Sequence, residues 1–597
     1  MTFSLEEFCQ KYPDEPQPWS HLSKSSIDFL KKLGLSAMHP FCHEKDPFPA
    51  DVPPMGALLV DEHHNTVFDR IVTIFLQVVP ALSAMAELWL RLFASAIAPI
   101  TIVHLILDHA SSDAKSGKTD TKLLGSKRWI SISCVLSIAS SAVLMTDTFY
   151  VLHFGPLYGG ILLCVATFLS MRACERHQLR RPAAINAILL LLTAYLVFHT
   201  GEAQFGGDNV PDTIDEGLYF SEQNTLVQNI ASHWPEETRT YSPQNGATSW
   251  LPTGDARTGI PFLVNFWHSP EWTRVWLPTH DDEVVALDIC FPPTGHNPRK
   301  PIILVLHGLN GGSKEEYVKD LTHRRSEEGY TIVVMIARGL MDLPIRGWNV
   351  FHGARIEDAH TAAKAVRRAL SPKQPLIGVG YSMGAIVMSN YVARSGRDCA
   401  LDAAMAVSGG LDMRHMKTYK RALRLWQPLL VEELRGTFVV GKFGEKYRHR
   451  LSKTQMLELM RAVHITDVDK QAVVTYNGYD DVIHYYSEMS AMGDIPMDSN
   501  DLENVGRIGN VSIPFAVLHA LDDPLCTWRT VASKEGIMHP SNLVKTGSGN
   551  VMMLLTKGGG HVGWPSGFIP QYEKWRWMSD AVGGFITGVE KAKTITK

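Results

Sequence analysis

Three hallmarks of common protein classes are missing from this chain of 597 residues. The first is an excess of one charge: 57 basic and 61 acidic residues leave a net charge of −4, so nucleic acid is not an expected partner. The second is paired cysteine, because the eight cysteines show no C-x-x-C and no regular spacing, which argues against a zinc site or a disulfide framework. The third is an H-E-x-x-H motif among the 25 histidines, so we predict no metal and no other cofactor.

The first 70 residues also lack the basic start and apolar stretch of a cleavable signal peptide. They are polar and contain several prolines, and we interpret residues 1–70 as an N-terminal soluble segment. A chain of this length is too long for one hydrophobic core, so two or more structural units are expected.

Long apolar stretches are concentrated between residues 71 and 199. They lie at 71–86, 88–107, 129–145, 149–169 and 183–198. The last three are each near the length of about 20 residues that crosses a bilayer, although two of them are short. Glu87, Arg91 and two prolines leave open whether the first two form one span, a hairpin or an interfacial pair. Since soluble core helices usually carry a polar face, we expect about four transmembrane spans in 71–199 rather than a buried helical bundle.

The charge of the connecting loops predicts an orientation for these spans. Basic residues are gathered in loops 108–128 and 172–182, and the turn 146–148 between them has none. Because Lys and Arg in short loops favour the cytoplasmic side, both loops would lie inside and the chain after Phe198 outside. We therefore expect an integral endomembrane protein, in the endoplasmic reticulum above all, with a lumenal C-terminal half. A glycosylation sequon at Asn510 is compatible with this orientation.

From residue 271 onward the chain alternates apolar strands with helices. Helices are expected around 315–328, 354–370 and after 382, and strands near 275–278, 283–291, 301–308, 330–339, 375–380, 401–410, 513–523 and 550–561. Continuous apolar strands separated by helices indicate a mostly parallel sheet covered on both faces. The preceding residues 200–270 are rich in Gly, Pro, Asn and Thr, which predicts a linker and wrapping segment.

A G-x-S-x-G motif, Gly380-Tyr381-Ser382-Met383-Gly384, stands between one of these strands and a helix. In that place the motif is typical of a nucleophile elbow, where the glycines remove Cβ atoms that would clash in a strained turn. The serine hydroxyl then projects above the edge of the sheet. The nearby Gly378-x-Gly380 does not fit a dinucleotide-binding loop, because the third glycine falls one place late and no acidic strand end follows.

Two later strand ends carry the partners that a nucleophilic serine needs. Asp522 and Asp523 end one strand, His561 follows the last, and chemistry in such sheets sits at the carboxyl ends of strands. The order Ser, acid, His is that of the α/β-hydrolases. We predict that Ser382 attacks an acyl carbonyl, that His561 takes and returns its proton, and that Asp523 fixes the imidazole tautomer. Asp522 is the alternative acid, and Asp412 a more distant one.

Acyl transfer also needs N–H donors for the oxyanion. The backbone N–H of Leu309, which follows His307-Gly308 at a strand end, is one candidate, and that of Met383, directly after the nucleophile, is the other.

Two further segments have more than one interpretation. Residues 411–509 are longer than an ordinary loop, so a lid insertion in the domain 271–597 is expected. Within it, 419–434 has one apolar side, which suits packing on the sheet as well as a surface for lipid. His352 and Asp358 are one residue further apart than in the H-x4-D motif of acyltransferases, so we interpret 352–358 as structural.

Several motifs together resemble those of the α/β-hydrolase-domain esterases, a family that includes plant embryogenesis-associated hydrolases, membrane-anchored vertebrate phospholipases and yeast medium-chain ester synthases/esterases. They are HGLNGGSKEEYVKDL, IARG, GYSMGA, ALDDPL and GGGHVGW, with YNGYDDVIHYYSEMSA (476–491) similar to the family's lid segment. The likeness runs from about Asn224 to Phe585. It implies an α/β-hydrolase fold with a mostly parallel eight-stranded sheet and helical lid, and a triad of Ser382, Asp523 and His561. The multi-span N-terminus departs from the family, whose familiar members have one anchor or none.

The resemblance implies medium-chain acyl esters, including phospholipids, as substrates. The leading hypothesis is therefore a membrane-embedded serine esterase, lipase or phospholipase that works through an acyl-enzyme, with membrane lipids as partners. Some relatives pass the acyl group to alcohols, so acyl transfer is the alternative. A non-catalytic membrane scaffold is a third reading.

Overall fold

The computed structural model describes residues 22–33, 210–248, 251, 254–341, 343–345, 349–417, 426–440, 451–462 and 464–595. The apolar segments expected to span a membrane, all within 71–199, lie outside these residues, as does most of 1–70. Among the helices that are described, none is long and apolar enough to cross a bilayer.

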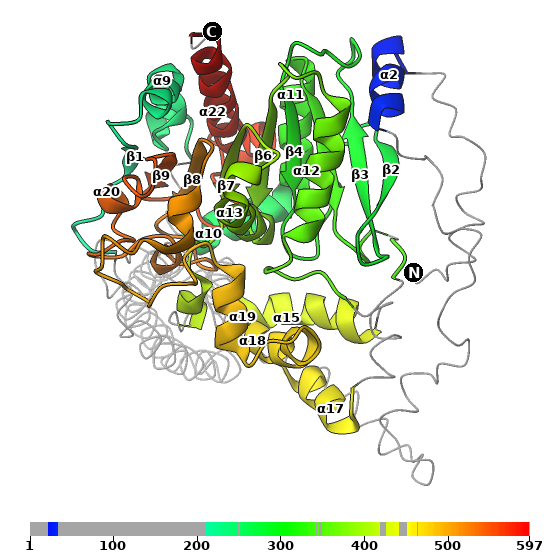
Figure 1. Cartoon of the computed structure of the whole chain (residues 1–597), viewed down its shortest axis with the longest axis vertical. Helices are drawn as coiled ribbons and strands as arrows, with labels where there is room; N and C mark the ends of the chain where they lie inside the picture. Colours follow the sequence, from blue (N-terminus) through cyan, green and yellow to red (C-terminus); the bar gives the residue numbers. More distant parts are fainter. Residues whose placement is uncertain are drawn as a thin grey trace, which may run out of the picture.

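One mixed sheet of nine strands forms the centre of the described chain (Figure 1). Its order across the sheet is β1 (Gly217–Tyr219), β9 (Val551–Thr556), β8 (Phe515–Ala520), β7 (Ala403–Val407), β6 (Leu376–Tyr381), β4 (Ile302–Leu306), β5 (Thr331–Ile336), β3 (Val284–Cys290) and β2 (Thr273–Pro278). All neighbours from β9 to β5 are parallel, whereas β1–β9, β5–β3 and β3–β2 are antiparallel. This is the strand arrangement of an α/β-hydrolase, with β1 added at one edge.

The sheet corrects one number predicted from the sequence. All eight expected strands are present, but β1 makes a ninth. It lies in the segment that composition indicated to be a linker and wrapping, and its three residues are too few to show any alternation. The same segment also forms α9 (Thr225–His233) and α10 (Gly254–Val264).

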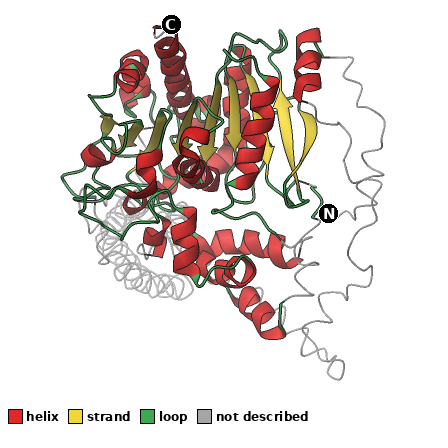
Figure 2. Cartoon of the chain, viewed as in Figure 1, coloured by secondary structure: helices red, strands yellow, loops and turns green. Residues whose placement is uncertain are grey.

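Helices cover both faces of the sheet, as Figure 2 shows. The first face packs against α9, α11 (Glu316–Glu327) and α22 (Arg576–Ile595), and the second against α2 (Lys24–Leu33), α12 (Glu357–Ala369) and α13 (Met383–Ser395). Alternate residues of each strand serve the two cores, because successive side chains point to opposite sides of the sheet. Since both faces are covered, the central strands are almost entirely apolar and are buried along their whole length.

The long insertion between β7 and β8 is helical where it is described. Its helices α15 (Gln427–Arg435), α17 (Lys453–Arg461), α18 (Ile465–Val468) and α19 (Val482–Met489) gather at one end of the sheet (Figure 1). Apolar side chains of α15, among them Val431 and Leu434, join the first core, so this part of the expected amphipathic segment packs inward. Two short helices, α20 (Pro540–Leu543) and α21 (Pro570–Glu573), lie on either side of β9 in sequence.

Candidate active site

Ser382 stands at the point where β6 turns directly into α13. Its backbone has φ 52° and ψ −118°, a conformation that residues other than glycine rarely adopt and that persists only when the surroundings enforce it. The surroundings here are very close. A Cβ on Gly380 would lie 2.3 Å from the carbonyl oxygen of Gly384, and one on Gly384 would lie 2.3 Å from that of Leu306. The strand, turn and helix predicted for this stretch are therefore present, and the two glycines are required by contact.

A continuous line of hydrogen bonds connects the three residues predicted to act together. The Ser382 hydroxyl lies 2.7 Å from His561 Nε2, and His561 Nδ1 lies 2.9 Å and 3.1 Å from the two carboxylate oxygens of Asp523. The side chain of Asp523 is fully buried. One of its oxygens also accepts the N–H groups of Leu525 and Cys526, at 2.8 and 2.9 Å. With Nδ1–H donating to this anchored carboxylate, Nε2 is left to accept the serine proton.

The neighbouring Asp522 faces a different set of partners. Its carboxylate accepts Arg257 Nη1 at 2.7 Å and the N–H of Gly560 at 2.8 Å. Burial raises the pKa of Asp522, and the Arg257 cation opposes that rise. Asp412, the more distant alternative, forms a bidentate pair with Arg414 instead. The structure thus brings Asp523, and neither alternative, to the imidazole.

The loop after β4, with the predicted oxyanion donor Leu309, lies against the nucleophile. A Cβ on Gly308 would be 3.3 Å from the Cβ of Ser382. The ring of His307 accepts the N–H of Ala337 at Nε2, at 3.2 Å, so its Nδ1–H donates to the carbonyl of Gly308, at 2.8 Å. Because a trans peptide points its C=O and N–H in opposite directions, this bond also fixes the direction of the Leu309 N–H.

Two further features prepare the same loop. Tyr317 of α11 accepts the N–H of Gly308 at its hydroxyl, at 2.9 Å, and so orients the preceding peptide unit. Burial lowers the pKa of His307, which keeps its ring neutral and able to accept as well as donate.

The second predicted donor, Met383, is the first residue of α13, where a backbone N–H has no acceptor within the helix.

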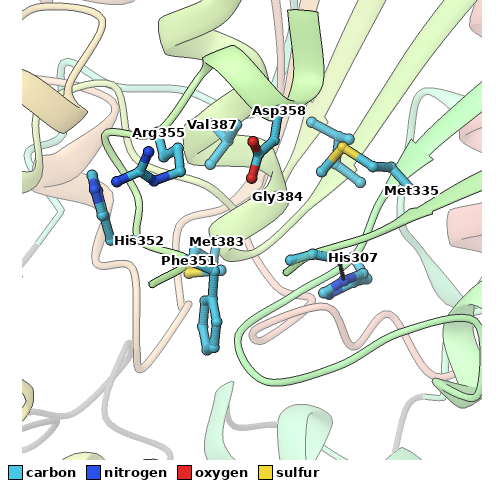
Figure 3. Close-up of a pocket in the computed structure, with 11 residues that line it drawn as sticks. His307, Met335, Phe351, His352, Arg355, Asp358, Met383, Gly384 and Val387 are labelled. Carbon is cyan, nitrogen blue, oxygen red and sulfur yellow. Dashed lines mark hydrogen bonds between the residues drawn. The ribbon is translucent and has the colours of Figure 1, made fainter. Parts of the chain in front are cut away.

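A small pocket lies behind the elbow (Figure 3). His352 and Arg355 line one side and His307 the other, with Met383 of the elbow between them. The pocket is small, with a cavity volume of about 30 Å³, and it is partly open to the surface. Most of its lining is apolar, and the polar side chains His307, His352, Arg355 and Asp358 complete it.

At one side of this pocket lies a partly buried group of charged and polar residues, which we call the arginine cluster: Arg338, Arg355, Asp281, Asp358 and Asn349. Arg338 uses all five of its N–H donors, on both carboxylates and on the carbonyl of Asn349. Asp358 is held by this guanidinium, so it does not serve as a partner of His352. The structural interpretation of 352–358 agrees with this geometry.

Two residues beside the site were not predicted. Arg257 and Thr258 lie on α10, yet they bond to Asp522 and to the backbone of His561. The only sign of these contacts in the sequence is the glycine run before His561. From composition alone, that run predicts no more than a loop. Among the described residues, no group of three or more His, Cys, Asp or Glu side chains is placed to hold a metal ion.

Comparison with known proteins gives matches over part of the chain. The family model described as serine aminopeptidase, S33 (Hydrolase_4) matches residues 297–534. Human phospholipase ABHD3 is 26% identical, with 57% of this chain and 78% of that protein covered. The putative esterase YheT of Escherichia coli is 26% identical, with 55% and 87% covered. Monoacylglycerol lipase of Saccharomyces cerevisiae is 24% identical, with 46% and 57% covered.

These matches confirm two predictions made from the motifs. The resemblance to α/β-hydrolase-domain esterases and lipases is confirmed, and so is the assignment to the ester-hydrolysing enzymes. The residues that match the family model include Ser382 and Asp523 and end before His561.

Proposed function

We propose that this α/β-hydrolase cleaves acyl esters of lipids through an acyl-enzyme formed on Ser382. The observation that carries the proposal is the unbroken line from the Ser382 hydroxyl through His561 to the buried Asp523. Each link in that line has the donor and acceptor that a serine nucleophile requires. An elbow backbone strained at the serine, and nowhere else along β6, fits the same role.

The proposed reaction has two halves. In the first, Ser382 Oγ attacks the ester carbonyl carbon while its proton passes to His561 Nε2. The imidazolium is stabilised by Asp523, and the oxyanion by the N–H groups of Leu309 and Met383. His561 then gives the proton to the departing alcohol. In the second half water attacks the carbonyl carbon of the acyl-enzyme while one of its protons passes to His561. His561 then returns this proton to Ser382 Oγ as the bond to the acyl group breaks, and the free acid leaves.

The proposed substrates are medium-chain lipid esters, phospholipids among them. Support comes from relatives whose names are phospholipase and monoacylglycerol lipase. The insertion 411–509 is proposed to act as a lid, because its helices gather at the end of the sheet where the strands deliver the site residues (Figure 1).

Membrane embedding and a lumenal site are part of the proposal. Their support is the apolar character of 71–199 and the basic loops within it. Protease treatment of sealed vesicles tests the orientation: digestion of the C-terminal half from the cytosolic side would refute a lumenal site.

The activity is tested with the purified full chain and a panel of p-nitrophenyl esters, monoacylglycerol and phosphatidylcholine in mixed micelles. We expect free fatty acid to be released by the wild type and not by Ser382→Ala. Equal release by both proteins would overturn the assignment. Adding a short alcohol to the same assay separates hydrolysis from acyl transfer, because transfer forms a new ester at the expense of free acid.

A further inference from the structure

The helix α10 lies directly on the loop that carries His561, although some 300 residues separate them in sequence. We call residues 558–563 the histidine loop. The N–H of His561 donates to the Thr258 hydroxyl at 2.8 Å. That hydroxyl in turn donates to the carbonyl of Gly254, one turn back along α10, at 2.7 Å. Thr258 is 3% exposed, so no water can replace it as the acceptor of the His561 N–H.

A second contact joins α10 to the same loop from the other side. Arg257 Nη1 donates to Asp522 Oδ2 at 2.7 Å, and Asp522 Oδ1 accepts the N–H of Gly560 at 2.8 Å. The side chain of Asp522 is fully buried, so the Arg257 cation also balances the negative charge of a carboxylate that lies next to Asp523 in the sequence. Thr258 therefore holds the backbone of His561 directly, and Arg257 holds that of Gly560 through Asp522.

The packing between helix and loop leaves no room for side chains. A Cβ on Gly560 would lie 2.6 Å from the carbonyl oxygen of Gly254, and one on Gly563 would lie 2.3 Å from that of Arg257. Close contact with α10 thus explains Gly560 and also Gly558, where a Cβ would lie 2.1 Å from Arg257 Nη1, whereas a Cβ on Gly559 would meet the Trp564 ring instead. Glycine-rich loops are otherwise the part of a structure that loses most order when its contacts are removed.

The helix itself is anchored to the insertion. Trp426, next to α15, donates its indole N–H to Asp255 at 2.6 Å. α10 is therefore held on one side by the insertion while its Arg257 and Thr258 hold the histidine loop.

We propose that α10 is a positioning clamp for the proton-transferring histidine, and that Thr258 and Arg257 are its two positioning residues. This inference rests on the proposed function, in which His561 moves a proton between Ser382 and the leaving group. A base that drifts by an ångström loses the geometry for that transfer, while ester binding is unaffected. The clamp should therefore act on kcat and leave KM alone.

The test compares Thr258→Val with Thr258→Ser in the full chain, using p-nitrophenyl octanoate. Valine keeps the shape of threonine but cannot accept the His561 N–H, whereas serine can. We expect Thr258→Val to lower kcat about 10- to 100-fold with KM within about twofold, and Thr258→Ser to stay within about threefold of the wild type.

A matched control is provided by Thr322 of α11. Its hydroxyl makes the same bond to the carbonyl one turn back, to Val318 at 2.7 Å, in an equally buried setting that touches no part of the histidine loop. Thr322→Val loses only the bond along the helix, so it should lower the melting temperature by no more than Thr258→Val and retain kcat within about twofold. Should Thr258→Val not fold, Arg257→Gln decides, because the Arg257 side chain is 18% exposed and its loss frees the loop from the other side. It should lower kcat by at least about threefold, again without a change in KM.

The outcomes separate this inference from the function beneath it. An active wild type, an inactive Ser382→Ala and a fully active Thr258→Val would overturn the clamp alone. Equal losses of kcat in Thr258→Val and Thr322→Val would also overturn the clamp. So would a loss of kcat in Thr258→Ser as large as that in Thr258→Val. A wild type without ester turnover would overturn the proposed function and the clamp with it.

Discussion

Two charged networks, both largely shielded from solvent, lie near the elbow, and they differ in what their protons can do. In the line from Ser382 to Asp523, a histidine stands between a hydroxyl and a carboxylate, so a proton can move along it. In the arginine cluster every carboxylate faces a guanidinium, which does not give up its proton in proteins. The geometry of the first network allows proton transfer, and that of the second holds elements together.

The arginine cluster joins a hairpin turn and a strand end of the sheet to the first turn of a helix that covers it. Asp281 comes from the turn between β2 and β3, Arg338 follows β5, and Asp358 begins α12. Burial alone would raise the pKa of Asp281, but hydrogen bonds from Arg338, Thr279 and Asn349 hold it well below its usual range. Buried charge as such therefore does not mark a catalytic site in this protein. What distinguishes the candidate site is the imidazole ring of His561, which can titrate and which is hydrogen-bonded to the hydroxyl of Ser382.

The largest expected effect separates the two networks by their histidines. His561→Ala should lower kcat/KM by at least about 10⁴-fold, because it removes the only base that contacts Ser382 among the described residues. His352→Ala, next to the arginine cluster, should change it by less than about tenfold, because His352 lines the pocket behind the elbow and contacts no reacting atom. Steady-state kinetics on both variants give the answer. Similar losses in the two would remove the distinction.

The next effect separates the two adjacent aspartates. Asp523→Asn should lower kcat by about 10⁴-fold, because an amide facing Nδ1 favours the wrong imidazole tautomer. Asp522→Asn keeps an oxygen for the Gly560 N–H and loses only the charge opposite Arg257, so we expect a loss of about tenfold. The same ester assay measures both. A greater loss of kcat in Asp522→Asn than in Asp523→Asn would show that Asp522 is the acid of the triad.

A third effect belongs to stability alone. Arg338→Met should lower the free energy of unfolding by about 3–5 kcal/mol, because it leaves the buried Asp358 without the guanidinium that faces it and removes one of the partners of Asp281. The kcat of the remaining folded protein should stay near that of the wild type. Urea unfolding followed by circular dichroism, with active sites counted by titration, measures the two quantities separately. A variant that loses kcat at unchanged stability would place the cluster in the catalytic machinery.

The smallest expected effect concerns a carboxylate that lacks an arginine. Burial raises the pKa of Glu315 to about 7, and its neighbours Glu433 and Glu316 add to the rise. The folded state then holds a proton that the unfolded state releases near pH 4.5, so stability should fall as pH rises from 4.5 to about 7. Asp281 has the opposite sign: its lowered pKa gives stability that is present at neutral pH and lost on acidification.

Thermal melts across this pH range test the sign. Glu315→Gln should match the wild type at pH 5 and melt a few degrees higher at pH 8. A wild type and a variant whose melting temperatures run parallel from pH 5 to pH 8 would show that Glu315 titrates normally.

The sequence predicted most of the sheet and the order of the site residues, because both are written in short local patterns. The apolar runs mark β4 to β9 one by one, and Ser382, Asp523 and His561 each follow such a run. Contacts between distant segments leave no such pattern. β1 has three residues, and the bond from His561 to Thr258 joins positions 303 residues apart. The separate roles of Asp522 and Asp523 likewise depend on Arg257, which only the fold brings near.

The central claim is that Ser382 is the nucleophile of the transfer network. Labelling of the full chain with a fluorophosphonate, followed by digestion and mass spectrometry, tests it directly. We expect a single adduct on the peptide that contains Ser382, with no labelling of Ser382→Ala. An adduct on another serine, or equal labelling of the two proteins, would contradict the account.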